Sequence, residues 1–448
     1  MNEAYIVGAV RTATGRKKGR LSNLHPVDMG AIVIDELIDQ TGVPTNGVDD
    51  VIFGVVSQIG SQAGNLGRNV AMSSKLDLEV PGTTVDRQCG SSLQAIQFGA
   101  QAVMSGTQDV VICGGVEAMS TVEIGSNIRD GLEHGRGTPK GERLELQYPG
   151  IQFSQFDGAE LLAEKYEITR DELDAFGLKS HQRASEATKN GLFKDEVVPL
   201  NIKLEDGSAD VHDIDEGIRF DASLESMQGL NPLREGGVIT AGTASQISDG
   251  AAAVMVANRD AVERYNLPVR AKIHSLAVVG SDPVIMLEGP IPASKKALEK
   301  AGLEINDIDL YEINEAFGSV PLAWAKAMNA SEDRLNVNGG AQALGHPLGG
   351  TGAKLMTTLV NELERRSARY GLVAICEGGG TANAMIVERM DQLPEEKRDL
   401  CYSIKINHRG WMKNFPSCEE QYVNSSKRNL PQLQKNGKNK GLLIGKPG

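Results

Sequence analysis

Apolar and polar positions alternate along the chain in a pattern that predicts an α/β protein. Short apolar runs rich in β-branched residues, such as "AYIVGAV" from residue 4 and "DVVICGG" from residue 109, are separated by longer amphipathic segments. The short runs are typical of buried strands and the longer segments of helices. Between residues 120 and 242 the alternation gives way to charged helices, such as "ITRDELDAFGLKSHQRASEA", and glycine-rich loops. We interpret this region as an inserted domain.

The chain also contains an internal repeat. "LIDQTGVPTNGVDDVIFG" (37–54) resembles "ALEKAGLEINDIDLYEIN" (297–314) at a constant offset of 260 residues, because 297 − 37 and 314 − 54 are equal. Both segments predict a helix that stops at glycine and leads into a strand. If the two halves pack about a pseudo-twofold axis, Cys89 and His346 lie at matching helix starts and meet. The alternative is a chance likeness between two generic strand–helix units.

The repeat and the loosened region divide the chain into four parts. We expect an N-terminal half formed by residues 1–120 and 243–268, an inserted loop domain over 121–242 and a C-terminal half over 269–390. Residues 391–448 are rich in Asn and Lys and contain no recognisable motif. We expect this tail to be disordered.

Composition narrows the class of protein. Of the 448 residues, 23% are charged and 40% are apolar, which is ordinary for a soluble globular protein, and the net charge of −13 argues against nucleic-acid binding. No apolar stretch approaches the roughly 18 residues of a membrane span, and the first residues lack a signal-peptide pattern. Five cysteines without a CxxC pair indicate thiols in a reducing compartment rather than disulfides or a metal site. We therefore expect a cytoplasmic protein.

Cys89 lies in "VDRQCGSSLQAIQFGAQAVMSG" (85–106), at the start of a predicted helix that is apolar almost all the way round. The helix macrodipole at this end favours thiolate over thiol, so we expect a pKa well below about 8.5 and a thiol ready to act as a nucleophile at neutral pH. The alternative is a small buried apolar residue.

Three further residues carry candidate chemistry. His346 in "NGGAQALGHPLGGTG" is placed to activate a thiol or polarise a carbonyl, and Cys376 in "CEGGGTA" is suited to moving a proton beside unhindered backbone N–H groups. Asn314 in "EINEAFGSV" can orient a water molecule. The alternatives are a structural histidine, a core thiol and a turn-forming asparagine.

Four stretches in this order, VDRQCGSS, NEAF, GGAQALGHPLGGTG and CEGGG, resemble the thiolase family of acetyl-CoA acyltransferases. The resemblance runs from about Ala4 to Met390. It implies two similar halves that form a five-layered α-β-α-β-α fold, with a loop domain inserted in the first half to hold coenzyme A. The resemblance places the helix behind Cys89 in the buried middle layer.

The resemblance also implies a role for each motif residue. Cys89 becomes acylated, and His346 activates it and shares a first oxyanion hole with a water held by Asn314. Cys376 moves protons at the substrate α-carbon or at the leaving thiol. The backbone N–H groups of Cys89 and Gly378 form the second oxyanion hole.

The implied reaction is CoA-dependent cleavage of a 3-ketoacyl-CoA to acetyl-CoA and a shortened acyl-CoA, as in β-oxidation, or the reverse condensation. Coenzyme A is a substrate, and no metal or permanently bound cofactor is implied. Ser245 and Arg219 match positions near the pantetheine arm and the nucleotide, and Glu315 has a supporting role. A homodimer or homotetramer is also implied, the tetramer through part of residues 121–145.

Several positions depart from commoner members and concern the substrate. Ser154-Gln155-Phe156 replaces a His-Met-Gly found in acetoacetyl-specific enzymes, and Glu377 places a charge next to Cys376. Further departures occur at Asp86, Ser92 and Ala382. They resemble thiolases for bulkier acyl or ring-bearing substrates. The alternatives to a thiolase are a 3-ketoacyl synthase-like enzyme and a catalytically silent CoA-binding protein of the same fold.

Overall fold

The structure is a computed structural model, and it describes residues 3–204 and 207–395. The chain separates into one unit over Met1–Leu393 and a second over Pro394–Gly448. From residue 396 onward, the tail predicted to be disordered lies outside the described residues. The description that follows concerns the first unit.

Most strands of this unit belong to one mixed sheet, in the order β11-β12-β13-β10-β1-β9-β5-β3-β4, with β2 paired to β9 and β6 to β1. Strands β7 and β8 form a separate pair. The strand bounds are β1 Tyr5–Thr12, β2 Gly15–Arg16, β3 Asp50–Gly54, β4 Gly82–Val85, β5 Val110–Ala118, β6 Val197–Val198, β7 Leu200–Lys203, β8 Ala209–His212, β9 Ser248–Ala257, β10 Ala271–Gly280, β11 Leu310–Ile313, β12 Tyr370–Glu377 and β13 Thr381–Arg389.

The two ends of the main sheet repeat one topology. In the N-terminal half β4 and β5 flank β3 in parallel, and β9 and β1 follow in antiparallel order. In the C-terminal half β12 runs parallel to β11, β13 and β10 follow antiparallel, and a parallel bridge from Leu335 to Tyr311 stands where β4 would be. The halves meet where β1 and β10, the matching strands, pair Tyr5 with Lys272. The predicted repeat is confirmed, while the domain boundaries stay a prediction.

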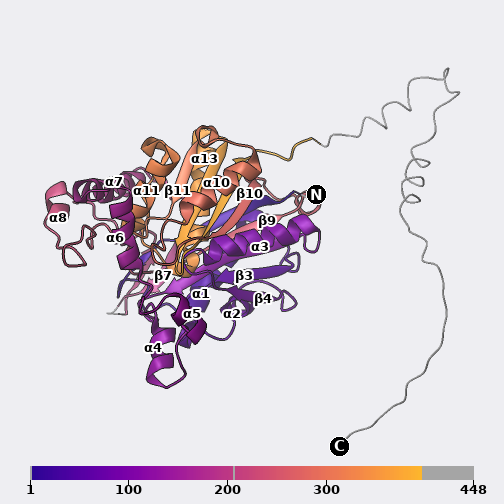
Figure 1. The fold of residues 1–448 in the computed structure, drawn as a ribbon. Helices are drawn as coiled ribbons and strands as arrows, with labels where there is room; N and C mark the ends of the chain where they lie inside the picture. The colour runs from indigo at the N-terminus through magenta and orange to yellow at the C-terminus, as the bar shows by residue number, and fades with distance from the viewer. Residues whose placement is uncertain (1–2, 205–206, 396–448) are drawn as a thin grey trace, which may run out of the picture. The chain divides into compact units, whose positions relative to one another are not determined.

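The helices cover both faces of the sheet (Figure 1). α1 packs against α2 and β9, and α10 packs against α11 and β13, so these pairs form the outer layers. α3 and α13 contact each other and strands of both halves, which places them in the middle layer. The bounds of these helices are α1 Pro26–Thr41, α2 Leu66–Ser73, α3 Ser91–Ser105, α10 Pro290–Ala301, α11 Ser319–Met328 and α13 Thr351–Arg366. The five-layered arrangement expected from the resemblance is confirmed.

The middle helices approach closely because small residues line their contact. A Cβ built on Gly352 would lie 2.2 Å from the backbone nitrogen of Leu93, so no side chain fits there. The Ser92 hydroxyl accepts a hydrogen bond of 2.9 Å from the backbone N–H of Ala353. Ser92, a departure from the commoner glycine, therefore links the two buried helices.

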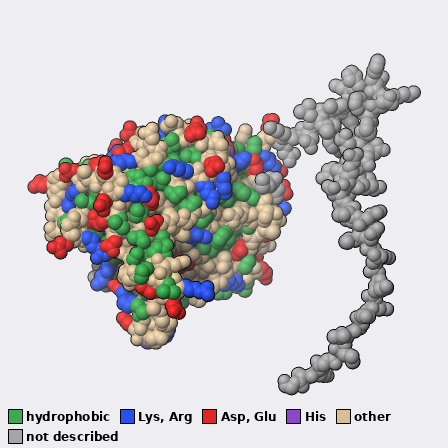
Figure 2. All heavy atoms as spheres, viewed as in Figure 1, with side chains coloured by type: hydrophobic (Ala, Val, Ile, Leu, Met, Phe, Trp, Pro, Cys, Tyr) green, Lys and Arg blue, Asp and Glu red, His purple; other side chains and the backbone are tan. Residues whose placement is uncertain are grey.

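The predicted inserted region contributes helices joined by loops: α4 Ser126–Glu133, α5 Glu142–Gln147, α6 Gln155–Lys165, α7 Arg170–Lys189 and α8 Leu224–Gln228. The remaining elements are α9 Arg259–Tyr265, α12 Ala341–Leu344 and the short 3-10 turns at Gly60–Gln62, Ile305–Asp307, Glu332–Arg334 and Leu348–Gly350. Among the described residues, no helix is both long and apolar enough to cross a bilayer. Acidic and basic side chains are interspersed over the face shown in Figure 2.

Candidate active site

Cys89 lies in a tight turn between β4 and α3. The Asp86 carboxylate accepts from the backbone N–H of Gln88 at 2.8 Å, and the Ser91 hydroxyl accepts from the N–H of Arg87 at 2.9 Å and donates to the Gln88 carbonyl at 2.6 Å. These bonds hold Gln88 at a φ of +48°, in the left-handed region. Because such a conformation persists only where its surroundings enforce it, the turn fixes the direction of the Cys89 side chain.

His346 lies on the matching element of the C-terminal half, between α12 and α13. Its backbone N–H donates to the Ser248 hydroxyl at 2.7 Å, and its ring Nδ1 lies 2.6 Å from the Thr351 hydroxyl. That hydroxyl donates its proton to the Pro347 carbonyl at 2.9 Å. Since the hydroxyl proton is committed to Pro347, Nδ1 must carry the hydrogen shared with Thr351. The Nε2 lone pair of His346 is therefore available as a base.

Asn314 stands beside this lone pair. Its Nδ2 lies 3.4 Å from Nε2 of His346, and its backbone N–H donates to the Ala374 carbonyl at 3.1 Å. The side chain is fully buried, and its Oδ1 has no hydrogen-bond partner among the described residues. A buried acceptor without a partner is costly unless something else occupies it, which is the place expected for a bound water.

The two predicted catalytic thiols lie close enough to influence each other. Cys376 is in β12, paired with Ala382 of β13, and Cys89 is one of the groups that raise its pKa, after burial. Cys89 is 8% exposed, against 1% for Cys376 and 3% for His346. The predicted nucleophile is therefore the most accessible of these reactive groups.

The expected low pKa of Cys89 is wrong. Burial raises the pKa of this thiol to about 12, and the neighbouring Glu377 carboxyl raises it further. Burial also lowers the pKa of His346 to about 3, with help from the charge of Lys354. Desolvation outweighs the helix macrodipole here, so the resting pair is a neutral thiol and a neutral imidazole rather than an ion pair.

Gly378 lies in the three-residue loop that joins β12 to β13. A Cβ built on Gly378 would lie 2.8 Å from the side-chain oxygen of Gln88. The loop therefore packs against the residue before Cys89. This is the neighbourhood in which the two backbone N–H groups of the predicted second oxyanion hole would have to converge.

The supporting role predicted for Glu315 agrees with its contacts. Its carboxylate accepts from the Ser180 hydroxyl at 2.8 Å, the Asn336 amide at 2.9 Å and the backbone N–H of Gln342 at 3.1 Å. It thereby joins α7 to α12, which it contacts at Gln342, four residues before His346. Glu315 orients the two loops that carry Asn314 and His346.

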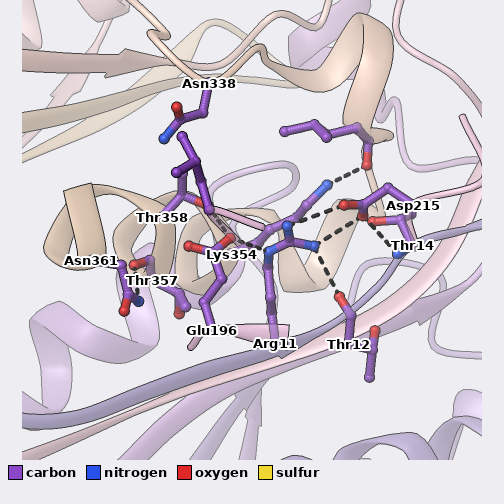
Figure 3. A network of polar contacts seen from close by, with 12 residues as sticks. Arg11, Thr12, Thr14, Glu196, Asp215, Asn338, Lys354, Thr357, Thr358 and Asn361 are labelled. Atoms are coloured by element: carbon purple, nitrogen blue, oxygen red, sulfur yellow. Dashed lines mark hydrogen bonds and ion pairs between the residues drawn. The ribbon is translucent and has the colours of Figure 1, made fainter. Parts of the chain in front are cut away.

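Sequence reasoning missed a buried ionic network around Arg11 (Figure 3). Arg11 of β1 bonds Glu196 at 2.7 Å and Asp215 at 2.9 and 3.1 Å, and all three side chains are almost completely buried. Glu196 also accepts from the Thr358 hydroxyl of α13 at 3.0 Å. The network therefore joins two segments of the predicted inserted region, at Glu196 and Asp215, to both halves of the core.

Lys354 extends this network to the loop that carries His346. Its Nζ donates to the carbonyls of Leu344 and, at 3.1 Å, of Gly345, directly before His346. Burial lowers the pKa of Lys354 to about 7, and Asp215 opposes that change. The signals for these residues were an arginine inside the apolar strand "YIVGAVRT" and a lysine in the segment "TGAKLMTTLV" at the start of α13, where the neighbouring residues are uncharged.

The two predicted coenzyme A residues lie in different surroundings. The Ser245 backbone N–H donates to the Ala316 carbonyl at 2.9 Å, which brings the residue beside the Asn314 motif. Arg219 is exposed and lines a cavity of about 420 Å³ with Gln182, Lys189 and Phe220. Lys189 lies over the Phe220 ring, 5.7 Å from its centroid. Two cations and an aromatic ring suit a phosphorylated nucleotide.

Two thiols, an imidazole and an amide at the contact of two repeated α/β halves define an acyltransferase of the thiolase fold. The thiolase N-terminal and C-terminal domain models match residues 4–260 and 267–389. The chain belongs to the thiolase family, and it is an acyltransferase.

Relatives of known name cover nearly the whole described region. A steroid 3-ketoacyl-CoA thiolase of Mycobacterium tuberculosis is 51% identical over 392 residues, which is 87% of this chain and 95% of the relative. An acetyl-CoA acetyltransferase of Chromobacterium violaceum is 41% identical, over 86% of this chain and all of that one. The crystal structure of human mitochondrial 3-ketoacyl-CoA thiolase superposes with a TM-score of 0.78 at 36% identity, over 87% of this chain and 99% of that one.

Proposed function

We propose that this thiolase cleaves 3-ketoacyl-CoA esters that carry bulky acyl groups, through an acyl-enzyme on Cys89. The observation that carries the proposal is the His346 ring, whose Nδ1 hydrogen is fixed by Thr351 so that Nε2 keeps a lone pair, which faces the Asn314 amide. An unprotonated imidazole suits proton transfer during thioester chemistry.

In the proposed first half-reaction, the Cys89 sulfur attacks the 3-keto carbon while Nε2 of His346 accepts the thiol proton. The protonated ring and a water on Oδ1 of Asn314 then stabilise the oxyanion. The bond between the α-carbon and the keto carbon breaks, and the acetyl-CoA carbanion takes its proton from Cys376. Burial raises the pKa of Cys376 well above its usual value, so this thiol holds a proton to give.

In the second half-reaction, a new CoA thiol gives its proton to the Cys376 thiolate and attacks the acyl group on Cys89. The backbone N–H groups of Cys89 and Gly378 are proposed to stabilise the second oxyanion. The Cys89 thiolate that departs recovers its proton from His346. The same steps in reverse form a carbon–carbon bond. Cleavage consumes one CoA as a substrate and the reverse condensation releases it, and neither direction requires a metal or redox cofactor.

Coenzyme A is proposed to place its phosphates in the cavity of Arg219 and Lys189, with the pantetheine arm passing Ser245. The positive charges at that cavity and the contact of Ser245 with the Asn314 motif support this path. Arg219→Ala is expected to raise the KM for CoA about tenfold and leave kcat nearly unchanged. With CoA lacking its 3′-phosphate, the wild-type and Arg219→Ala enzymes should differ less.

The preference for bulky acyl groups is proposed from the segment 154–156. The Phe156 ring stacks edge-on against Phe317 at a centroid distance of 5.5 Å, next to the Asn314 motif. An aromatic side chain therefore stands where acetoacetyl-specific enzymes have His-Met-Gly, and the 51% identical relative is named for steroid substrates. The name of this relative, together with an exposed aromatic ring on which an apolar group can pack, favours bulky acyl groups over acetoacetyl-CoA.

The experiment is thiolysis of a panel of 3-ketoacyl-CoA esters, followed by the loss of enolate absorbance. We expect kcat/KM for long-chain or ring-bearing esters to exceed that for acetoacetyl-CoA by at least tenfold, and Cys89→Ala to abolish turnover with every ester. A preference for acetoacetyl-CoA would overturn the substrate assignment. Activity in Cys89→Ala would overturn the mechanism, and turnover that depends on malonyl-CoA would favour a synthase.

A homodimer or homotetramer remains part of the proposal. The protruding helix α4 exposes Ile128 and Leu132, with Ile124 just before it, and such an apolar face supports assembly through residues 121–145. Light scattering should show Ile128→Glu reducing a tetramer to a dimer.

A cytoplasmic location is proposed because Cys89, Cys113 and Cys376 are free thiols, as in a reducing compartment.

A further inference from the structure

The carboxyl of Glu377 is fully buried beside both catalytic thiols. It follows Cys376 at the end of β12, and its Oε2 accepts from the Thr381 hydroxyl at 2.6 Å. Its other oxygen, Oε1, has no hydrogen-bond partner among the described residues. A buried carboxylate oxygen without a partner is costly, so the side chain is favoured in its protonated form.

The unpartnered oxygen lies against the turn that holds the nucleophile. A Cβ built on Gly90 would lie 2.0 Å from Oε1 of Glu377, so position 90 must be glycine while Glu377 is present. Next to this contact, the Asn383 amide donates to the Gly90 carbonyl at 2.9 Å. Two side chains of the β12–β13 hairpin therefore clamp the residue that follows Cys89.

The charges around Glu377 do not force it to ionise at neutral pH. Burial raises the pKa of Glu377 to about 8, although Thr381 and Arg87 oppose the rise, while Asp86 adds to it. Glu377 in turn raises the pKa of the Cys89 thiol, with smaller contributions from Glu117 and Asp86. The Glu377 carboxyl also raises the pKa of Cys376, the residue before it in the sequence.

We propose that Glu377 is a positioning residue that must keep its proton for Cys89 to react. As a neutral acid it packs on Gly90 and leaves the thiol of Cys89 free to ionise. As a carboxylate it places a negative charge beside the developing thiolate and opposes it. The inference rests on the proposed role of Cys89 as nucleophile and adds an upper pH limit to it.

The test is alkylation of Cys89 in the full-length protein by iodoacetamide, measured between pH 6 and 10 by mass spectrometry of the Cys89 peptide. Glu377→Gln keeps the shape of the side chain and cannot ionise. We expect the two proteins to react at equal rates below pH 7. Above pH 8, Glu377→Gln should react at least tenfold faster, because a unit charge a few ångströms away shifts a pKa by roughly one unit or more.

Two further variants test whether the effect comes from the ionisation of Glu377. Thr381→Val removes the hydroxyl that stabilises the Glu377 carboxylate, so the pKa of Glu377 should rise in this variant. The pH above which alkylation is slower than in Glu377→Gln should therefore be higher for Thr381→Val than for wild type. Glu312→Gln removes another buried carboxyl, from β11, and should leave the alkylation profile unchanged. A rate ratio between Glu377→Gln and wild type that stays constant with pH would overturn the proposal. Because alkylation needs no turnover, that outcome is distinct from a failure of the proposed thiolysis.

Discussion

Nδ2 of Asn314 lies 3.4 Å from Nε2 of His346, and the other atom of the same amide, Oδ1, has no partner among the described residues. The amide therefore has one end against the imidazole proposed as the base and one end that can accept a hydrogen bond from a water. Neither residue is near the other in sequence. Their contact depends on β11 and the α12–α13 loop ending at the same place.

Removing the Asn314 amide should reduce turnover without unfolding the protein. Asn314→Ala removes the group that holds the proposed oxyanion water, so we expect kcat to fall about a hundredfold with little change in KM. Steady-state thiolysis measures the effect. Asn306→Ala, at an exposed position, is the control and should retain wild-type kcat. Equal kcat values for the two variants would argue against the water.

The hydroxyl of Thr351 should matter through the tautomer of His346. Thr351→Val keeps the size of the side chain and removes the acceptor for the Nδ1 hydrogen, so Nε2 would be protonated more often and could not act as a base. We expect kcat to fall at least tenfold. Thr351→Ser restores the hydroxyl and should recover most of the activity. If valine and serine gave the same kcat, the hydrogen bond at Nδ1 would have no catalytic role.

Cys376 should be needed for proton transfer at the α-carbon. We expect Cys376→Ala to lose thiolysis by about a hundredfold or more and to lose the exchange of acetyl-CoA methyl protons for deuterium, which NMR detects. Cys113→Ala removes another buried free thiol, in β5, and should keep both activities. Deuterium exchange that persists in Cys376→Ala would assign the proton transfer to another group.

The sequence predicted the repeated architecture, and the proposed grouping of the reactive residues rests on that repeat. The glycine stops after α1 and α10, at Gly42 and Gly302, both adopt positive φ, 69° and 66°. Equal helix ends and equal strand orders bring the two halves into register, so the starts of α3 and α13 lie together. That argument needs only the apolar pattern and the offset between the repeats.

The ionisation state of Cys89 could not be predicted in the same way. The helix macrodipole is visible in the sequence, but the burial and the neighbouring Glu377 that raise the pKa depend on β12 packing against the turn 86–90. The partners of Arg11 could not be predicted from the sequence either. Glu196 and Asp215 lie 185 and 204 residues further along the chain, in loops with no strong pattern.

Lys354 gives a prediction about stability and pH. In the unfolded chain its pKa is near 10.5, whereas burial lowers the pKa in the folded protein to about 7. Between these values the unfolded state binds more protons than the folded state, so this residue makes stability rise with pH across the window from about 7 to 10.5. The slope is at most about 1.4 kcal/mol per pH unit.

Lys354→Met should remove that slope and disturb the loop before His346. The variant lacks the donors to the carbonyls of Leu344 and Gly345, so we expect kcat to fall about tenfold, whereas Lys354→Arg should restore part of it. The free energy of unfolding from urea titrations at pH 7 and pH 9 should rise less with pH in Lys354→Met than in wild type. Lys326→Met removes an exposed lysine that also donates to two carbonyls, and it should follow the wild-type pH dependence. The same pH dependence in Lys354→Met and wild type would mean that Lys354 does not lose its proton on folding.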